Sequence, residues 1–363
     1  MKTNSEPLPA IERPRARLST RAAVLLALAA ATFLAWLPFR RPADASTMVQ
    51  ETRDVLSTFV TITVVARDEA AGQKEISGAF ALIERLQETL SAYDPASELA
   101  RVNAQAARAP VQVSGTLFEA MQTGVDWHER TGGAFDITVR PLLLLWRNGA
   151  KEDRLPTESE LTAARALLGA GRLRLDPEHR TVALPFEGMT LDLGGLGKGF
   201  IADRVVHQLQ RGGVRNALVA NAGDIYALGR RADGLPWAVG VQDPRRLNDP
   251  KALLTVLHLS NRAVSTSGNY ERYVTIQNKR YSHIVDPRTG RTAENVPSVT
   301  VIGPDVTTTD ILGTALSVLG VEDGLALIEK LPGVEAMFVV YDEEDRPLIT
   351  RSSGFAMYEA KAR

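Results

Sequence analysis

The chain has 363 residues, enough for one large domain or two smaller ones and for a sizeable buried core. Its 42 basic and 43 acidic side chains give a formal net charge of -1, which argues against a partner held by neutralisation of a phosphate backbone, so we expect no nucleic acid. Cysteine is absent, which excludes disulfide bonds, a lipid-modified cysteine anchor and cysteine zinc sites.

The first 45 residues have the form of an export signal. Four arginines between positions 13 and 21 precede an uncharged apolar run at 22–37, and Ala43-Asp44-Ala45 offers a small-x-small cleavage site. The run is short for a membrane span, which needs roughly 20 apolar residues. We therefore expect residues 1–45 to be a signal peptide or an uncleaved signal anchor that attaches the protein to the inner membrane through residues 22–37. In either case the body, residues 46–363, is exported to the periplasm.

The body alternates strand and helix patterns. Apolar residues recur at helical spacing in 76–90, 116–130, 201–210, 308–319 and 321–331. Residues 157–160 have capping-box spacing and open a helix that runs to 168, and residues 91–103 predict a turn that leads into a short helix. Strands are predicted at 58–66, 216–222, 237–242, 252–260, 272–277, 281–285, 298–302, 336–341 and 355–359, with a further hairpin at 172–185. Because strands occur in pairs as well as between helices, we expect an α+β fold, and the lack of a proline- or serine-rich linker favours one catalytic domain.

Residues 190–200 read TLDLGGLGKGF, with four glycines in six positions around Lys198. A glycine-rich turn that feeds a helix presents free N–H groups to an anion. Gly199 follows the lysine where a Walker A loop has Ser or Thr, and G-x-G-x-x-G spacing is absent. A structural glycine turn is thus as good an interpretation as a ligand loop. Asp192, just upstream among apolar residues, needs a partner if it is buried.

His283 lies on a predicted strand, where its side chain shares one face with those of Tyr281 and Val285. A lone histidine on a strand is more often structural than catalytic, and no G-x-S-x-G nucleophile motif is present. Asp310 and Thr314 stand four positions apart, so on a helix their oxygens share one face. Such oxygens suit Mg²⁺, although Asp and Thr near a helix start are also ordinary capping residues. Together, the glycine stretch with Lys198, the strand with His283 and the helix with Asp310 and Thr314 suggest phosphate chemistry assisted by a divalent metal.

Eight stretches resemble the ApbE-type flavin transferases and follow one another in the family's order: 56–64, 90–104, 132–146, 191–205, 217–229, 263–274, 281–290 and 307–320. The resemblance as a whole covers roughly residues 56–341. The sequence departs from the family at three places. Leu56-Ser57-Thr58 stands where relatives commonly have Met-Gly-Thr, Gly197 replaces an alanine, and residues 220–224 read ANAGD where Asn-x-Gly-Gly-Asp is usual.

The resemblance implies an ApbE-like, T-fold-like α+β domain of mixed sheets with packed helices. It also implies an FAD:protein FMN transferase, which uses Mg²⁺ to cleave FAD, joins the FMN half through a phosphoester to a Ser or Thr hydroxyl of an acceptor protein, and releases AMP. The expected acceptor is an exported, membrane-linked redox protein. Two alternatives stay open, an FAD pyrophosphatase that yields FMN and AMP, and a non-catalytic protein that holds FAD intact.

By position, the resemblance assigns three groups of residues. His283 would help to activate the acceptor hydroxyl, and Asp310 would act in catalysis as a metal ligand. The metal would be held by Asp310, Thr314 and the backbone carbonyl of Gly195. FAD would be contacted by Leu56, Tyr93, Ala134, Phe135, Asp136, Asp192, Lys198 and Ile284.

Overall fold

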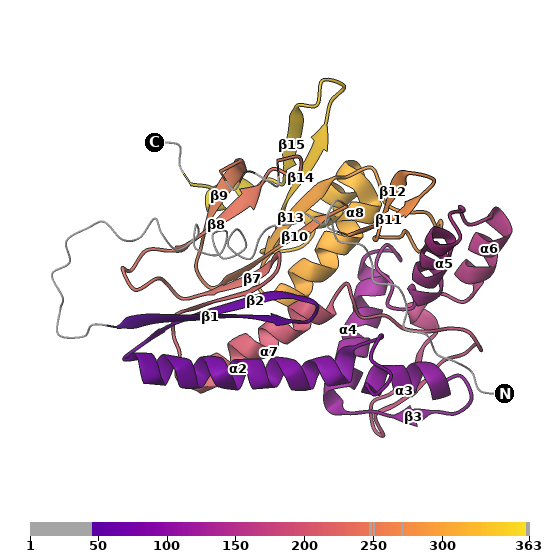
Figure 1. Cartoon of the computed structure of the whole chain (residues 1–363), viewed down its shortest axis with the longest axis horizontal. Coiled ribbons are helices and arrows are strands. Elements are labelled where there is room, and N and C mark those ends of the chain that lie inside the picture. The colour runs from indigo at the N-terminus through magenta and orange to yellow at the C-terminus, as the bar shows by residue number, and fades with distance from the viewer. Residues whose placement is uncertain (1–45, 247–248, 250, 270–271, 361–363) are drawn as a thin grey trace.

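The structure is a computed structural model that describes residues 46–246, 249, 251–269 and 272–360. The export signal predicted for residues 1–45 lies outside the described residues. The centre of the body is an eight-stranded antiparallel sheet in the order β1-β2-β6-β7-β10-β13-β14-β15 (Figure 1). Its strands are Thr47–Val55, Thr58–Ala66, Ala217–Asn221, Asp224–Leu228, Arg262–Gly268, Ser298–Gly303, Glu335–Tyr341 and Pro347–Arg351. The predicted α+β class is confirmed.

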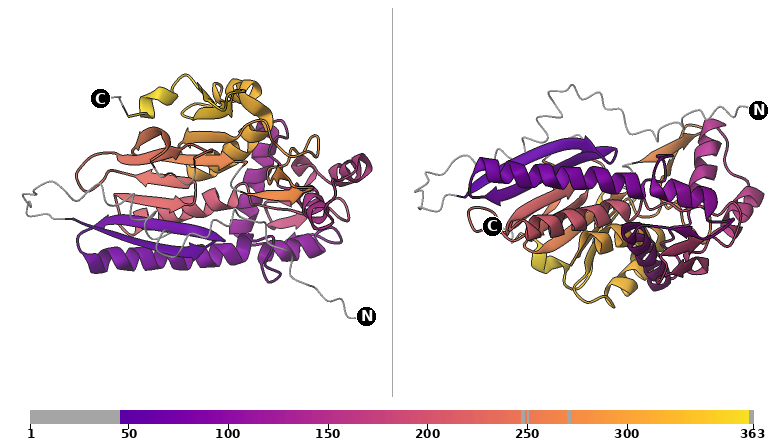
Figure 2. Two further views of the ribbon diagram at one scale, coloured as in Figure 1. Left: turned by 45° about the horizontal axis from the view of Figure 1, so that its top comes forward. Right: turned by 90° about the horizontal axis from the view of Figure 1, so that it is seen from below.

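Three helices cover one face of this sheet: α2 (Glu69–Leu90), α7 (Gly197–Arg211) and α8 (Val306–Ile328). Figure 2 shows α2 running along the β1–β2 hairpin. The main core fills the space between helices and sheet, where Ile62, Phe80 and Phe338 have no exposed surface. Burying each such side chain contributes about 1.5–3 kcal/mol, so the apolar stripes of these helices hold them on the sheet.

The opposite face carries a smaller core. The hairpin of β8 (Trp237–Gln242) and β9 (Leu253–Leu259) packs there, and Trp237 and Leu257 meet Met337 of the sheet. The strand predicted at 355–359 is wrong, because residues Phe355–Tyr358 form a single 3-10 turn, η3, that inserts the fully buried Phe355 into this core. Only the next residue, Glu359, makes a β-bridge.

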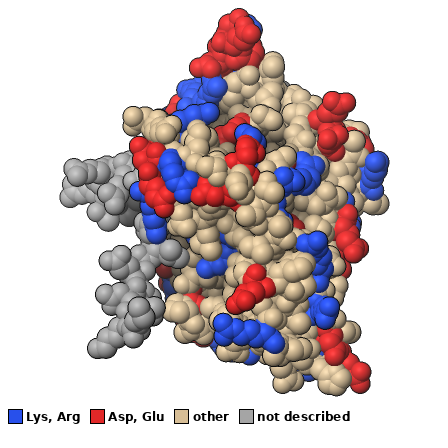
Figure 3. Space-filling view, turned by 90° about the vertical axis from the view of Figure 1, so that its right-hand side faces the viewer, with Lys and Arg blue, Asp and Glu red and all other residues tan. Residues whose placement is uncertain are grey.

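The remaining elements gather beyond the end of the sheet. They are α3 (Glu98–Gln105), α4 (Gly115–Arg130), α5 (Arg140–Lys151), α6 (Glu158–Ala166) and η2 (Ala170–Arg172), with the small sheet β3 (Val111–Gln112), β5 (Thr181–Ala183), β4 (Arg174–Asp176) and the hairpin β11 (Tyr273–Ile276) and β12 (Lys279–Ser282). The predicted capping box of α6 is confirmed between Thr157 and Glu160. A third core joins α5, α6 and β11 through Leu142, Leu161 and Ile276. Figure 3 shows that Lys and Arg are interspersed with Asp and Glu on this side of the molecule.

Helix α8 is the apolar centre of the fold. Within the described residues it is long and apolar enough to span a membrane, with a mean hydropathy of 1.7. It packs instead on β10, β13 and α7, and Ile311, Leu312 and Leu316 are fully buried. The backbone leaves helical geometry at Gly320, where φ is 83°, which accounts for the two separate helices predicted at 308–319 and 321–331.

Candidate active site

A cleft of about 360 Å³ opens between the end of the large sheet and the helical part of the molecule. It is lined by the glycine stretch at 194–198, the β6–β7 turn, the segment 282–287 and side chains of α5 and α8. All residues assigned to FAD or metal from the sequence line it except Leu56. Leu56 lies in the β1–β2 turn with φ of 56° and donates its backbone N–H to Oε1 of Gln87 on α2, while Thr58, the first residue of β2, reaches the cleft.

Glycine in the 194–199 stretch lets α7 and α8 approach closely. A Cβ atom at Gly199 would lie 2.5 Å from the carbonyl oxygen of Val306 and 2.9 Å from Cβ of Asp310. The backbone N–H of Gly199 donates to Oδ2 of Asp310 at 3.0 Å. Asp203, one turn further along α7, accepts from the backbone N–H groups of Val306 and Thr307 at 2.8 Å each. The two helix starts are therefore locked together, which places Asp310 beside the glycine stretch.

Lys198 is bound by two buried carboxylates. Its Nζ atom donates to Oδ1 of Asp310 at 3.0 Å and to Oδ2 of Asp224, which follows the β6–β7 turn. Burial lowers the pKa of Lys198, but the charges of Asp224 and Asp310 outweigh it and the net shift is upward, so the ammonium stays protonated. Burial and the neighbouring Asp224 raise the pKa of Asp310. When both carboxylates are ionised, this cluster of Lys198, Asp224 and Asp310 carries a net charge of -1.

Gly195 and Thr314 lie next to this cluster and bring further oxygen donors to it. Thr314 lies one turn after Asp310 on α8, and a Cβ atom at Gly195 would lie only 3.2 Å from its Oγ1. Nothing in the described part of the chain hydrogen-bonds to the Thr314 hydroxyl, and no three His, Cys, Asp or Glu side chains there form a metal cluster. A carboxylate, a hydroxyl and a backbone carbonyl are hard donors that fit Mg²⁺, whose remaining ligands are then water and substrate oxygens.

His283 is held in one tautomer. Its Nδ1 atom lies 2.9 Å from the backbone carbonyl oxygen of Arg272, which can only accept, so Nδ1 carries the proton and Nε2 keeps its lone pair. Burial, reinforced by the positive charge of Arg272, lowers the pKa of His283 to about 4. The ring is therefore neutral at pH 7, and its Nε2, which has no hydrogen-bond partner among the described residues, is an unprotonated acceptor in the cleft lining.

Tyr93 and Asp192 form one wall of the cleft. The Tyr93 hydroxyl donates to Oδ2 of Asp192 at 2.6 Å, and the backbone N–H of Gly194 donates to Oδ1 at 2.7 Å, so the buried carboxylate has the partners that its burial requires. Arg147 on α5 donates from Nη2 to the Tyr93 hydroxyl at 2.7 Å, and its guanidinium lies over the ring at 4.6 Å from the centroid. The side-chain amide of Asn103 fixes the backbone just before Asp192, because it donates to the carbonyl oxygen of Leu191 and accepts from the N–H of the same residue.

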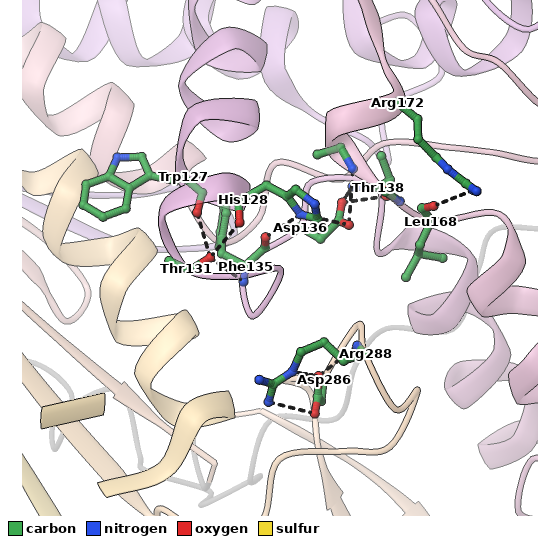
Figure 4. Close-up of polar contacts among 12 residues, drawn as sticks. Trp127, His128, Thr131, Phe135, Asp136, Thr138, Leu168, Arg172, Asp286 and Arg288 are labelled. Atoms are coloured by element: carbon green, nitrogen blue, oxygen red, sulfur yellow. Dashed lines mark hydrogen bonds and ion pairs between the residues drawn. The ribbon is translucent and has the colours of Figure 1, made fainter. Parts of the chain in front are cut away.

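Asp136 lines the cleft, but its carboxylate is already engaged by its neighbours (Figure 4). Oδ1 accepts from the backbone N–H and the hydroxyl of Thr138 at 2.7 and 2.6 Å. Oδ2 lies 3.3 Å from both the N–H of Ala170 and Nδ1 of His128. These contacts make Asp136 a brace for the 134–139 segment, whose Ala134 and Phe135 face the cleft. Ile284 reaches the cleft from the segment after β12, where its N–H donates to Ser282 Oγ.

Three charged residues that line the cleft were not singled out from the sequence: Arg147, Asp224 and Arg272. Asp224 and Arg272 lie inside stretches that carry the family resemblance, 217–229 and 263–274, and Arg147 directly follows the apolar run of 142–146. The position of a charged residue in the sequence does not show whether its side chain is paired or lines a cleft, so these three residues could be identified only from the structure.

Comparisons with known proteins agree with this fold. A family model described as the ApbE family matches residues 56–338. The chain is 35% identical over 309 residues to the FAD:protein FMN transferase of Treponema pallidum (80% of this chain, 84% of that one). It is 34% identical over 291 residues to one from Klebsiella pneumoniae (80% and 88%).

Solved structures give the same result. The flavin transferase ApbE from Vibrio cholerae superposes with a TM-score of 0.76 at 30% identity, covering 86% of this chain and 99% of that one. The ApbE protein from Thermotoga maritima superposes with a TM-score of 0.78 at 30% identity, covering 87% and 100%. The family match, the identities and the superpositions each extend over most of the body, and the chain belongs to the ApbE family.

Proposed function

We propose that the protein is an Mg²⁺-dependent FAD:protein FMN transferase that joins FMN through a phosphoester to a Ser or Thr hydroxyl of an acceptor protein and releases AMP. One observation carries the proposal: Lys198, His283 and the oxygen donors Asp310 and Thr314, from distant parts of the chain, line a single cleft. The names of the curated relatives, FAD:protein FMN transferase, support the same reaction.

The chain's own residues then have separable roles. Tyr93, Phe135 and Ile284 hold the flavin nucleotide against the cleft wall. Nε2 of His283 accepts the proton of the acceptor hydroxyl as its oxygen forms a bond to the phosphorus of the FMN half. The bond from that phosphorus to the bridging oxygen breaks, and its electron pair leaves with AMP. Gly195, Asp310 and Thr314 would hold Mg²⁺, which would supply positive charge to the phosphates when bound.

The cellular setting is also part of the proposal. The export-type sequence of residues 1–45 supports a periplasmic location, with or without attachment through residues 22–37. The acceptor is then an exported protein, and a membrane-linked redox protein is the class that makes use of covalent FMN.

An acceptor mass assay tests the reaction. The full chain is incubated with FAD, Mg²⁺ and candidate exported acceptors, AMP is quantified, and each acceptor is weighed intact. We expect AMP release with a matching gain of one FMN group on the acceptor, and neither when the His283→Asn variant replaces the wild type. AMP release without a mass gain on any acceptor identifies a pyrophosphatase, and retention of intact FAD identifies a non-catalytic binding protein.

A further inference from the structure

The charged groups of the cleft divide into paired and unpaired ones. Lys198 is shared by Asp224 and Asp310, and Nη1 of Arg140 lies 3.8 Å from Oδ2 of Asp192. Arg140 thus compensates the charge of Asp192, and the two carboxylates at Lys198 exceed its single positive charge. Arg147 and Arg272, which also line the cleft, form no ion pair with any carboxylate that the structure describes.

These two guanidinium groups come from different elements and face the same space. Arg147 lies on α5 and is fixed over Tyr93 by a hydrogen bond to a neutral hydroxyl. Arg272 directly precedes β11, and its backbone carbonyl orients His283. Both positive charges help to lower the pKa of His283, which agrees with their position close to its ring. The part of the cleft around Lys198, Asp224 and Asp310 is therefore net negative, and the part around Arg147 and Arg272 is net positive.

We propose that Arg147 and Arg272 bind the phosphate groups of the dinucleotide, and that Lys198 instead holds Asp224 and Asp310 in place beside the metal donors. The inference rests on the proposed function, because it takes FAD as the ligand. A guanidinium donates two parallel hydrogen bonds that match phosphate oxygens, and two such cations complement a diphosphate dianion. The negative cluster then attracts the divalent cation.

The surroundings favour this assignment. The surface on the α5–α6 side mixes both signs of charge, so no broad basic face attracts an anion there (Figure 3). Both arginines are half-buried in a partly enclosed cleft, where a charge is screened less than on the surface. An unpaired cation in such a place is a site for an anion.

Flavin fluorescence titrations of the full chain without Mg²⁺ test the proposal. We compare wild type, Arg147→Gln and Arg272→Gln, with Arg130→Gln as the matched control, because Arg130 also lies over an aromatic ring, Trp127, but outside the cleft lining. Charged hydrogen bonds are worth enough for the affinity for FAD to fall about 10- to 100-fold in each cleft variant. The control and the melting temperatures stay near wild type.

Competition with inorganic pyrophosphate separates phosphate binding from stacking. Pyrophosphate should displace FAD from the wild type and from the Arg130 variant, and much less from the two cleft variants. Equal competition in all four proteins, or unchanged FAD affinity in the cleft variants, overturns the assignment of the arginines. A wild type that binds no FAD counts against the proposed function itself.

Discussion

The Nζ atom of Lys198 lies 3.0 Å from Oδ1 of Asp310, although 112 positions separate the two residues in the chain. The contact exists because α7 and α8 begin side by side, with Gly199 giving the space and its N–H binding the second carboxylate oxygen. The glycine stretch therefore serves helix packing and also places a carboxylate at the cleft. Its structural and functional interpretations are two aspects of one arrangement.

Asp310→Asn should remove Mg²⁺-dependent turnover while leaving the fold intact. The amide keeps an acceptor for the Gly199 N–H, and Lys198 keeps Asp224 as a partner, but the charge that a divalent cation needs is gone. We expect the rate to fall by roughly 10²- to 10³-fold, as for other losses of transition-state charge stabilisation. AMP release measured against Mg²⁺ concentration checks this.

Asp323→Asn is the matched control, since Asp323 lies on the same helix but is exposed and outside the cleft lining. It should behave as wild type in activity and melting temperature. An Asp310→Asn protein that is folded and as active as the control would remove Asp310 from the metal site.

His283 predicts a pH dependence of stability. Its pKa is about 4 in the folded protein, below the ordinary value of 6.5. Below about pH 6.5 His283 is protonated in the unfolded chain but stays neutral in the folded protein. The free energy of unfolding therefore decreases as the pH falls from 6.5 towards 4, and His283 does not change it above that window. The difference in melting temperature between wild type and His283→Asn should therefore be constant above pH 7 and shift against the wild type on acidification. A difference that stays flat to pH 4 would show that His283 is not held neutral.

Much of the fold follows from sequence periodicity. Helix α2 was predicted because its apolar residues recur every three or four positions, and β2 because branched residues alternate over Thr58–Ala66. Strands β1 and β10 were not predicted, since one carries charged residues at successive positions and the other is rich in serine. Helix α5 was not predicted because its N-cap residue, Val139, has no capping side chain, although Pro141 in the first turn is typical of a helix start.

The candidate site was predictable only in part. The residues were assigned through a family resemblance, and the structure places all but Leu56 at one cleft. What the sequence could not give is which charges neutralise one another, because Asp224 and Asp310 meet Lys198 only after β7 and α8 have packed on α7. The same limitation hid Arg147 and Arg272.

Two neighbouring glycines should respond oppositely to alanine. At Gly199 a Cβ atom would overlap the Val306 carbonyl and press on Asp310, so Gly199→Ala should force α7 and α8 apart and destabilise the protein by about 1–3 kcal/mol. At Gly197 a Cβ atom would meet nothing within 4 Å in the described structure, and Gly197→Ala should stabilise by about 0.4–1 kcal/mol. Urea denaturation of both variants checks the signs. Equal effects would mean that the helices are not in close contact at Gly199.

Ala222→Gly should stabilise the protein without loss of activity. Ala222 and Gly223 form the turn between β6 and β7, and Ala222 has φ of 53°, a left-handed conformation that costs a non-glycine residue roughly 1–2 kcal/mol. Glycine relieves this strain but loses about 0.4–1 kcal/mol through the greater freedom of the unfolded chain, so the net gain is at most about 1.5 kcal/mol.

Ala220→Gly is the control for Ala222→Gly, because Ala220 lies within β6 without a positive φ and glycine there should destabilise by about 0.5–1 kcal/mol. The measurement is the urea midpoint of each variant at an unchanged denaturant slope. Asp224 directly follows the turn and binds Lys198, so activity also reports on its geometry. A more stable Ala222→Gly protein with reduced activity would mean that the strained turn itself holds Asp224 in position, whereas destabilisation by both substitutions would show that the turn is not strained.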